Sequence, residues 1–166
     1  AEVEWEVAIP GGTHELKLLA PSEAGTSVSE PLLVVGPRLP GQQPTLHRVC
    51  IGVNDYDDAG LKLNAAAGDA SEVFAAFGRE CTGPYNRFGL ARGQLLLNKE
   101  ATRENCLKAL AETRKQARPG DLVVVFFAGH GVKQDSEFFL LTREADTAKP
   151  LKGISLSGED LRKALS

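Results

Sequence analysis

The chain has 166 residues, of which 42% are hydrophobic and 25% are charged, and its formal net charge is −3. This composition is typical of an ordinary soluble globular protein and excludes the disordered, collagen-like and disulfide-dense classes. Because the chain is mildly acidic and has no arginine-rich segment, no nucleic-acid partner is expected. The longest apolar run, residues 122–128, is far shorter than the roughly 20 residues that cross a membrane, so no membrane partner is expected either.

The first 35 residues read as an antiparallel β meander. Apolar residues alternate with acidic and small ones between Val3 and Ile9, and residues 14–18 and 28–35 form two further extended runs separated by glycine-containing turns. The segment resembles the last strands of an immunoglobulin-like domain, in which case the natural protein continues upstream. A local β appendage that packs on the main domain is the other reading.

Residues 36–46 contain prolines and glycines with little apolar content, which predicts an extended linker. From residue 47 to residue 166, short apolar runs alternate with helical patterns, as in a parallel sheet covered by helices. The expected fold class is α/β, a three-layer αβα sandwich with a mostly parallel sheet. Strands are predicted at 48–53, 94–97, 121–127 and 137–141, with 121–127 in the centre of the sheet, and helices at 65–77, after Thr102 and after a capping box at 157–160.

The three cysteines, Cys50, Cys81 and Cys106, are odd in number and widely spaced, which predicts neither a disulfide framework nor a zinc site. A reducing, cytoplasmic location is therefore expected. Cys50 falls in a predicted strand and Cys106 in a predicted helix, where a cysteine usually behaves as a small hydrophobe. The histidines His14 and His47 fall in the meander and the linker and receive no role.

A histidine with a glycine on each side ends the apolar run at Val125–Ala128. In open α/β sheets ligands bind at the carboxyl ends of strands, so His130 is predicted at a ligand-binding edge. Gly129 and Gly131 allow close backbone approach and unusual dihedral angles, so a substrate could lie against this loop. From the residues alone, a tight turn with a histidine of no function is the alternative.

Five segments in series carry a family resemblance: RVCIGVNDY, AAAGDASEVFAAF, LLLNKEATRENCLKAL, DLVVVFFAGHGV and EFFLLTREAD. In this order and spacing, across about residues 47–166, they resemble the caspase-like cysteine peptidases, in particular the bacterial and metacaspase branches. Gly-His-Gly is common by chance, whereas the whole series is not. The resemblance implies a peptide or protein substrate, hydrolysed by a cysteine–histidine dyad.

The resemblance places the dyad histidine at His130, as general acid and base, and makes the backbone N–H of Gly131 an oxyanion donor. It places the nucleophile in an Asp-x-Cys sequence about 50 residues after the histidine, near position ~180. That position lies beyond Ser166, and all three cysteines precede His130. We therefore expect residues 47–166 to be a truncated catalytic domain, inactive alone, that a C-terminal chain or segment completes.

Asp69 has two readings. The sequence Asp69-Ala70-Ser71-Glu72 has the spacing of a helix capping box, which would make the aspartate structural. In the metacaspases and paracaspases that this segment resembles, the matching aspartate lines the S1 subsite and pairs with arginine or lysine at P1. The resemblance therefore implies cleavage after basic residues, although Lys62 lies where animal caspases carry the arginine that binds a P1 aspartate. Ala128 and Gly129 are expected to line the substrate as well.

Asp55, Asp57 and Asp58 cluster after the first predicted strand, and calcium prefers oxygen ligands, so calcium dependence is conceivable. A solvated loop is the simpler reading; no metal site can be assigned, and no cofactor is expected. The alternative function is a catalytically inactive caspase-fold module that binds or scaffolds partners. A nucleotide-binding domain is disfavoured because no glycine-rich phosphate loop follows the first predicted strand.

Overall fold

The computed structural model describes residues 6–7, 12–22, 25–36, 43–79, 81 and 88–165. The chain divides into two compact units, Ala1–Gln43 and Pro44–Ser166.

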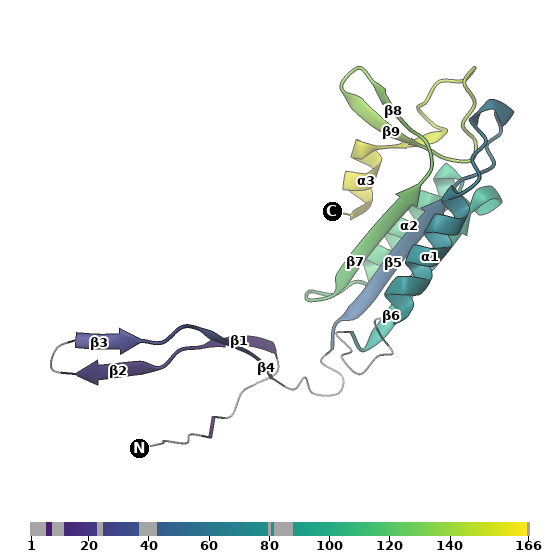
Figure 1. The fold of residues 1–166 in the computed structure, drawn as a ribbon. Helices are drawn as coiled ribbons and strands as arrows, with labels where there is room; N and C mark the ends of the chain where they lie inside the picture. The colour runs from purple at the N-terminus through teal and green to yellow at the C-terminus, as the bar shows by residue number, and fades with distance from the viewer. Residues whose placement is uncertain are drawn as a thin grey trace. The chain divides into compact units, whose positions relative to one another are not determined.

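The first unit contains an antiparallel ribbon (Figure 1). Strand β1 (Gly12–Leu16) pairs with β4 (Leu32–Gly36), and β2 (Leu19–Ser22) pairs with β3 (Gly25–Val28). The extended run predicted at 28–35 is thus divided between two strands, and most of the strand predicted between Val3 and Ile9 lies outside the described residues. A two-stranded ribbon has no second layer to cover its apolar side chains. The most exposed of these are Leu18, Leu19, Val28, Leu32 and Leu33.

The second unit is built on a parallel sheet with the order β6-β5-β7. Strand β5 (Thr45–Gly52) is buried along almost its whole length because it pairs with β6 (Leu90–Leu97) on one side and β7 (Leu122–Ala128) on the other. We expected β7 in the centre because it is apolar on both faces, but in the described sheet it pairs on one side only. Its residues after Leu122 are accordingly half-buried, whereas most of those in β5 are buried.

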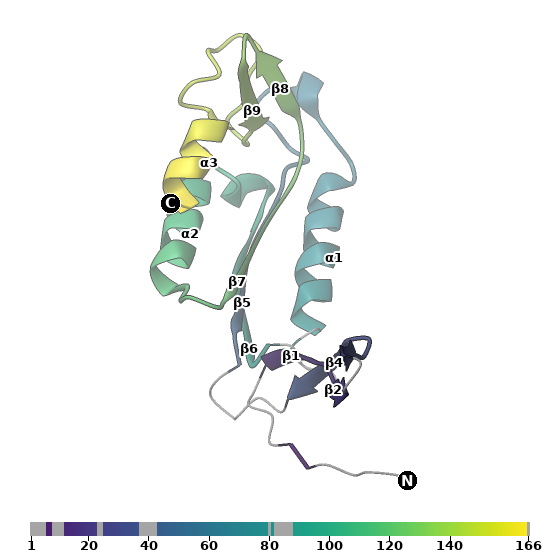
Figure 2. The ribbon, with the colours of Figure 1, turned by 90° about the vertical axis from the view of Figure 1, so that its left-hand side faces the viewer.

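Helices cover both faces of this sheet (Figure 2). Helix α1 (Ala66–Arg79) lies on one face, and α2 (Arg103–Gln116) and α3 (Gly158–Leu165) lie on the other. The side chain of Thr102 caps α2 as predicted, because its Oγ1 accepts the N–H of Asn105 at 3.2 Å. The predicted α/β fold with a parallel sheet between helical layers is therefore confirmed.

A small antiparallel sheet follows the parallel one, in the order β10-β9-β8. Strand β9 (Glu137–Leu141) was predicted, but β8 (Gly131–Gln134) and β10 (Ser155–Ser157) were not, because each is too short to show an alternating pattern. Asp135 takes a left-handed φ of 56° in the two-residue turn between β8 and β9. Two short 3-10 helices, Ala59–Leu61 and Asn98–Glu100, follow β5 and β6.

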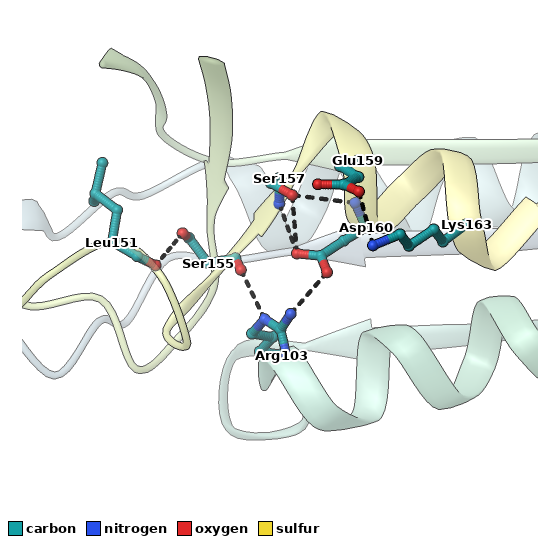
Figure 3. Close-up of polar contacts among 7 residues, drawn as sticks. All are labelled: Arg103, Leu151, Ser155, Ser157, Glu159, Asp160 and Lys163. Atoms are coloured by element: carbon teal, nitrogen blue, oxygen red, sulfur yellow. Dashed lines mark hydrogen bonds and ion pairs between the residues drawn. The ribbon is translucent and has the colours of Figure 1, made fainter. Parts of the chain in front are cut away.

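The capping box predicted at the start of α3 is present (Figure 3). The Oγ of Ser157 accepts the N–H of Asp160, and a carboxylate oxygen of Asp160 accepts the N–H of Ser157, each at 3.1 Å. Asp160 also accepts a hydrogen bond from Arg103 at 2.8 Å, and the Nε of Arg103 donates to the carbonyl of Ser155. This network joins the start of α2 to the start of α3.

The hydrophobic core lies between the parallel sheet and helices α2 and α3. Cys50 and Cys106 have no exposed surface, as expected of cysteines that act as small hydrophobes. None of the helices in the described ranges is long and apolar enough to cross a membrane.

Candidate functional site

Polar residues follow all three parallel strands at their carboxyl ends: Asn54 after β5, Asn98 after β6 and His130 after β7. Asn98 has a left-handed φ of 45°, and its side-chain oxygen accepts the N–H groups of Asn54 at 2.8 Å and Asp55 at 3.3 Å. The side-chain oxygen of Asn54 in turn accepts the N–H of Ala67 at 3.1 Å. These bonds fix the loop after β5 and the start of α1 against the same edge of the sheet.

His130 is half-buried at this edge and is held by the loop after β5. Its backbone N–H donates to the hydroxyl oxygen of Tyr56 at 2.9 Å, and its ring Nε2 lies 2.9 Å from the carbonyl oxygen of Leu61. The rings of Tyr56 and His130 pack at a centroid distance of 5.3 Å and a 44° tilt. The ring therefore stands at the rim of the sheet rather than in the core.

The contact with Leu61 decides which ring nitrogen of a neutral His130 carries the hydrogen. A carbonyl oxygen can only accept, so Nε2 must carry the hydrogen of this bond. In the neutral ring, Nδ1 is then the nitrogen with the free electron pair. This is the nitrogen that can take a proton from a nucleophile placed next to it.

Neither glycine next to His130 adopts a left-handed φ, but both are closely packed. A Cβ at Gly129 would lie 2.8 Å from the hydroxyl oxygen of Tyr56 and 2.9 Å from the ring of Phe127. A Cβ at Gly131 would lie 2.6 Å from the ring of Phe138. The close backbone approach that we predicted is therefore to aromatic side chains of the chain itself.

The backbone N–H of Gly131 points outward from the sheet. Gly131 lies opposite Leu140 in the β8–β9 ladder, and Leu141 donates its N–H to the carbonyl of His130 at 2.9 Å. This pattern makes Gly131 and Leu140 a non-hydrogen-bonded pair, whose own N–H and C=O groups point away from the partner strand. The N–H of Gly131 is therefore not used in the β8–β9 ladder.

Asp69 is an exposed residue in the first turn of α1, not the cap of that helix. The capping-box reading is wrong because α1 already begins at Ala66, and the N–H of Asp69 donates to the carbonyl of Ala65, the residue just before the helix. The same turn rests on Gly52, where a Cβ would lie 2.6 Å from the carbonyl of Ala66.

The register of the sheet relates this turn to the histidine. Gly52 is the partner of Ala128 in the β5–β7 ladder, and Ala128 lies two residues before His130. Ala128 is half-buried and Gly129 is exposed. Asp69 and the loop that carries His130 are therefore placed at the same edge of the sheet.

Two of the carboxylates after β5, those of Asp57 and Asp58, interact with side chains and backbone N–H groups elsewhere in the chain. Asp57 forms an ion pair with Arg143 at 3.2 Å. Asp58 accepts the hydroxyl of Thr147 at 2.5 Å, and this bond together with those from the backbone N–H groups of Gly60 and Thr147 lowers the pKa of Asp58. These contacts tie the loop that holds His130 to the loop after β9. Within the described ranges, no group of three or more histidine, cysteine or acidic residues is arranged to hold a metal ion.

The buried cysteines do not reach the histidine. Burial raises the pKa of Cys50, and burial together with the nearby Glu144 raises the pKa of Cys106 to about 12, so both thiols stay protonated and unreactive. Cys81 follows the end of α1, which runs from the carboxyl edge of the sheet back towards the amino edge (Figure 1).

His47 lies in β5 and not in the linker where the sequence placed it. It is 3% exposed, and its Nε2 lies 3.1 Å from a carboxylate oxygen of Asp121. The pair joins the amino ends of β5 and β7, opposite His130. The linker reading failed because the apolar strand pattern becomes continuous only at Val49.

Tyr56 and the carbonyl of Leu61 are the site groups that the sequence did not reveal. In the sequence, the segment around Tyr56 stands out by its carboxylates. In the structure, Tyr56 itself makes the contacts with His130. A tyrosine just after a buried strand was the available signal, because a buried tyrosine hydroxyl needs a hydrogen-bond partner. No sequence pattern marks the carbonyl of Leu61.

Comparison with known proteins identifies the family of the chain and a protein of similar fold. Residues 47–148 match the family model described as the metacaspase, peptidase C14 domain. The crystal structure of protein GSU0716 from Geobacter sulfurreducens has a similar fold, with a TM-score of 0.50 and 22% sequence identity. The match covers 73% of this chain and 44% of that protein, so the chain spans less than half of its length. A search of curated proteins found no match. Because the family model covers more than half of the chain, the protein belongs to the metacaspase, peptidase C14 family.

Proposed function

We propose that this chain supplies the histidine half of the catalytic site of a cysteine endopeptidase that cleaves after basic residues. The observation that carries the proposal is the hydrogen bond from His130 Nε2 to the carbonyl of Leu61, which leaves Nδ1 as the basic nitrogen at the ligand-binding edge of the sheet. Membership in the C14 family supports the thiol chemistry. Buried cysteines kept as thiols suit a reducing compartment such as the cytoplasm.

In the proposed reaction, Nδ1 of His130 takes the proton of a cysteine thiol, and the thiolate attacks the scissile carbonyl carbon. The N–H of Gly131 donates to the oxygen of the tetrahedral intermediate. When the C–N bond breaks, the imidazolium gives its proton to the leaving amine, and water then hydrolyses the thioester. His130 therefore acts as base when the thiol attacks and as acid when the amine leaves. In the hydrolysis of the thioester it takes a proton from the attacking water and returns it to the departing sulfur.

The nucleophile is proposed to come from a further chain or segment that adds to β7. Cys50 and Cys106 are buried and unreactive. Strand β7 pairs with β5 on one side, so in the described sheet its other edge offers unpaired backbone groups. A groove of about 500 Å³ borders this strand. Its lining residues are Arg114, Ala117, Val123, Val125 and Leu165. An added strand would end at the same edge of the sheet as His130.

Asp69 is the proposed S1 residue. Its carboxylate is exposed at the edge that carries His130, and it is not a helix cap. The remaining structural role is a favourable charge in the first turn of α1, which is worth only about 0.3–1 kcal/mol. A charge-assisted bond to a P1 arginine or lysine would use the same carboxylate. Ala128 and Gly129 are proposed to border the substrate in this region.

The test uses protein in which this chain is joined by the segment that carries the nucleophilic cysteine, with fluorogenic peptides that have arginine, lysine or aspartate at P1. We expect cleavage after arginine and lysine, inhibition by thiol alkylation, and a loss of roughly 10²-fold or more in kcat when His130→Ala removes the acid and base. Asp69→Asn should lower kcat/KM for P1 arginine by on the order of tenfold.

Three results would count against the proposal. Preference for P1 aspartate would overturn the assignment of Asp69. Full turnover by His130→Ala would overturn the dyad. No hydrolysis of any peptide, with a folded protein, would favour an inactive caspase-fold module that binds partners.

A further inference from the structure

The hairpin that follows His130 carries an exposed aromatic ring next to the proposed oxyanion donor. Phe138 is 52% exposed, whereas its neighbour Phe139 is 4% exposed and belongs to the core. A Cβ at Gly131 would lie 2.6 Å from Cζ and 3.2 Å from Cε2 of Phe138, so the ring lies directly over the glycine. Single exposed apolar residues are common, so the position of this ring, and not its exposure alone, calls for an explanation.

The register of the hairpin shows which residues lie on the same face of it as Gly131. Phe138 is paired with Lys133 and Gly131 with Leu140, so these four residues share one face of the ladder. Val132 and Phe139 are paired on the opposite face, where Phe139 packs inward. Leu140 on this face is half-buried against the core, so Phe138 is the large exposed apolar residue of this face in the hairpin.

The hairpin and helix α1 lie in different directions from the end of β7. In both ribbon views α1 runs along one face of the parallel sheet, whereas β8 and β9 extend beyond the carboxyl end of β7 (Figures 1 and 2). Asp69, in the first turn of α1, would hold the side chain before the scissile bond. The residue after the scissile bond must leave past His130, because the imidazole protonates the amine of that residue.

From these placements we propose that Phe138 is a specificity-determining residue that forms an apolar subsite for the residue after the scissile bond. The inference rests on the proposed peptidase function. A leucine or similar apolar side chain at this position of the substrate covers the exposed ring and gains transfer free energy from the burial of both surfaces. Glycine at the same position gains neither. The backbone of Gly131 allows the ring to stand this close to the reacting carbonyl.

The test compares internally quenched peptides with arginine before the scissile bond and either leucine or glycine after it. The enzyme is the protein that also contains the nucleophilic cysteine. We expect the natural protein to favour leucine by about tenfold in kcat/KM, the size of a small apolar contact in an enzyme subsite. Phe138→Ala should reduce this ratio to nearly one by slowing only the leucine peptide, and Phe138→Tyr should keep it.

Two controls separate this inference from the function on which it rests. Alkylation by a peptidyl-arginine chloromethyl ketone reports the dyad and S1 without a residue after the scissile bond, and it should be the same in all variants. Leu90→Ala changes a 45% exposed apolar residue at the start of β6, and the ratio should stay unchanged.

The outcomes are distinguishable. Normal alkylation and cleavage with an unchanged ratio in Phe138→Ala, or with no preference in the natural protein, would overturn the role of Phe138 alone. Neither alkylation nor cleavage in the natural protein would overturn the proposed function and this subsite with it.

Discussion

At the scale of single residues, the site depends on how one short loop holds one histidine. Tyr56 is 8% exposed, and its hydroxyl accepts the backbone N–H of His130, while Leu61 accepts from the ring. Burial raises the pKa of Tyr56, and the bond from His130 offsets part of that rise. The tyrosine therefore remains a neutral acceptor at physiological pH, and the backbone and side chain of His130 are fixed from the same segment.

Tyr56→Phe tests this role because it keeps the ring and removes the acceptor. We expect a loss of about 1–3 kcal/mol in unfolding free energy, since a half-buried N–H is left without its partner. In the protein that contains the nucleophile, kcat should fall on the order of tenfold with KM nearly unchanged, because a displaced imidazole reacts poorly. Thermal melts and steady-state kinetics measure the two effects. A stability loss with unchanged kcat would show that Tyr56 only supports the fold.

At the scale of elements, the position of α1 is set by its contact with the end of β5. Gly52 packs against the first turns of the helix so closely that a Cβ on it would lie within 2.8 Å of the carbonyl of Ala66 and the side chain of Ala70. Because the start of α1 packs so closely on Gly52, the exposed Asp69 in its first turn lies at the edge of the sheet. The helix is also held by the side chain of Asn54, which accepts the N–H of Ala67.

Gly52→Ala should force α1 away from the sheet. We expect a loss of about 1–3 kcal/mol in unfolding free energy from overpacking, measured by urea denaturation. Gly68→Ala is the matched control in α1, because a Cβ there would have no atom within 4 Å. That change should raise stability by roughly 0.5–1 kcal/mol through helix propensity. Equal effects of the two changes would contradict the packing argument.

At the scale of the whole molecule, three aspartates join parts of the second unit that are far apart in sequence. The N–H groups of Thr45 and Arg118 lower the pKa of Asp121. Burial opposes ionisation of Asp160, but hydrogen bonds from Ser157 and Arg103 outweigh it and lower its pKa. Asp58, bound to Thr147, shifts in the same direction. The folded state therefore favours the charged carboxylates.

The pH dependence follows from the sign of these shifts. A carboxylate whose pKa is lower in the folded than in the unfolded state stabilises the fold at pH values above the unfolded value of about 4. That contribution is lost as the pH falls through the lowered folded value. Asp121→Asn and Asp160→Asn should therefore be less stable than the natural protein at about pH 7, and the difference should shrink below pH ~4. Denaturation at several pH values measures it; a difference that grows on acidification would contradict the assignment.

Much of the fold was predictable from sequence because its signals are local. The apolar runs gave the parallel strands, Thr102 and the box at Ser157 gave two helix starts, and the Gly-His-Gly after an apolar strand gave His130. The start of α1 was predicted to within one residue. The short strands β8 and β10 and the place of His47 in β5 were not predictable, because each depends on pairing with distant segments.

The sequence by itself determined the α/β class, the family resemblance and the position of His130 after a parallel strand. Hydrophobic periodicity and the order of motifs can be read from the sequence without knowing which segments meet. Only the tertiary structure decided that Nε2 of His130 faces Leu61, that the N–H of Gly131 points outward and that Phe138 covers Gly131. The physical reason is that hydrogen-bond direction and ring packing depend on which segments meet at the edge of the sheet. The contacts of His130 with Leu61 and Tyr56 join residues that are 69 and 74 positions apart in the sequence.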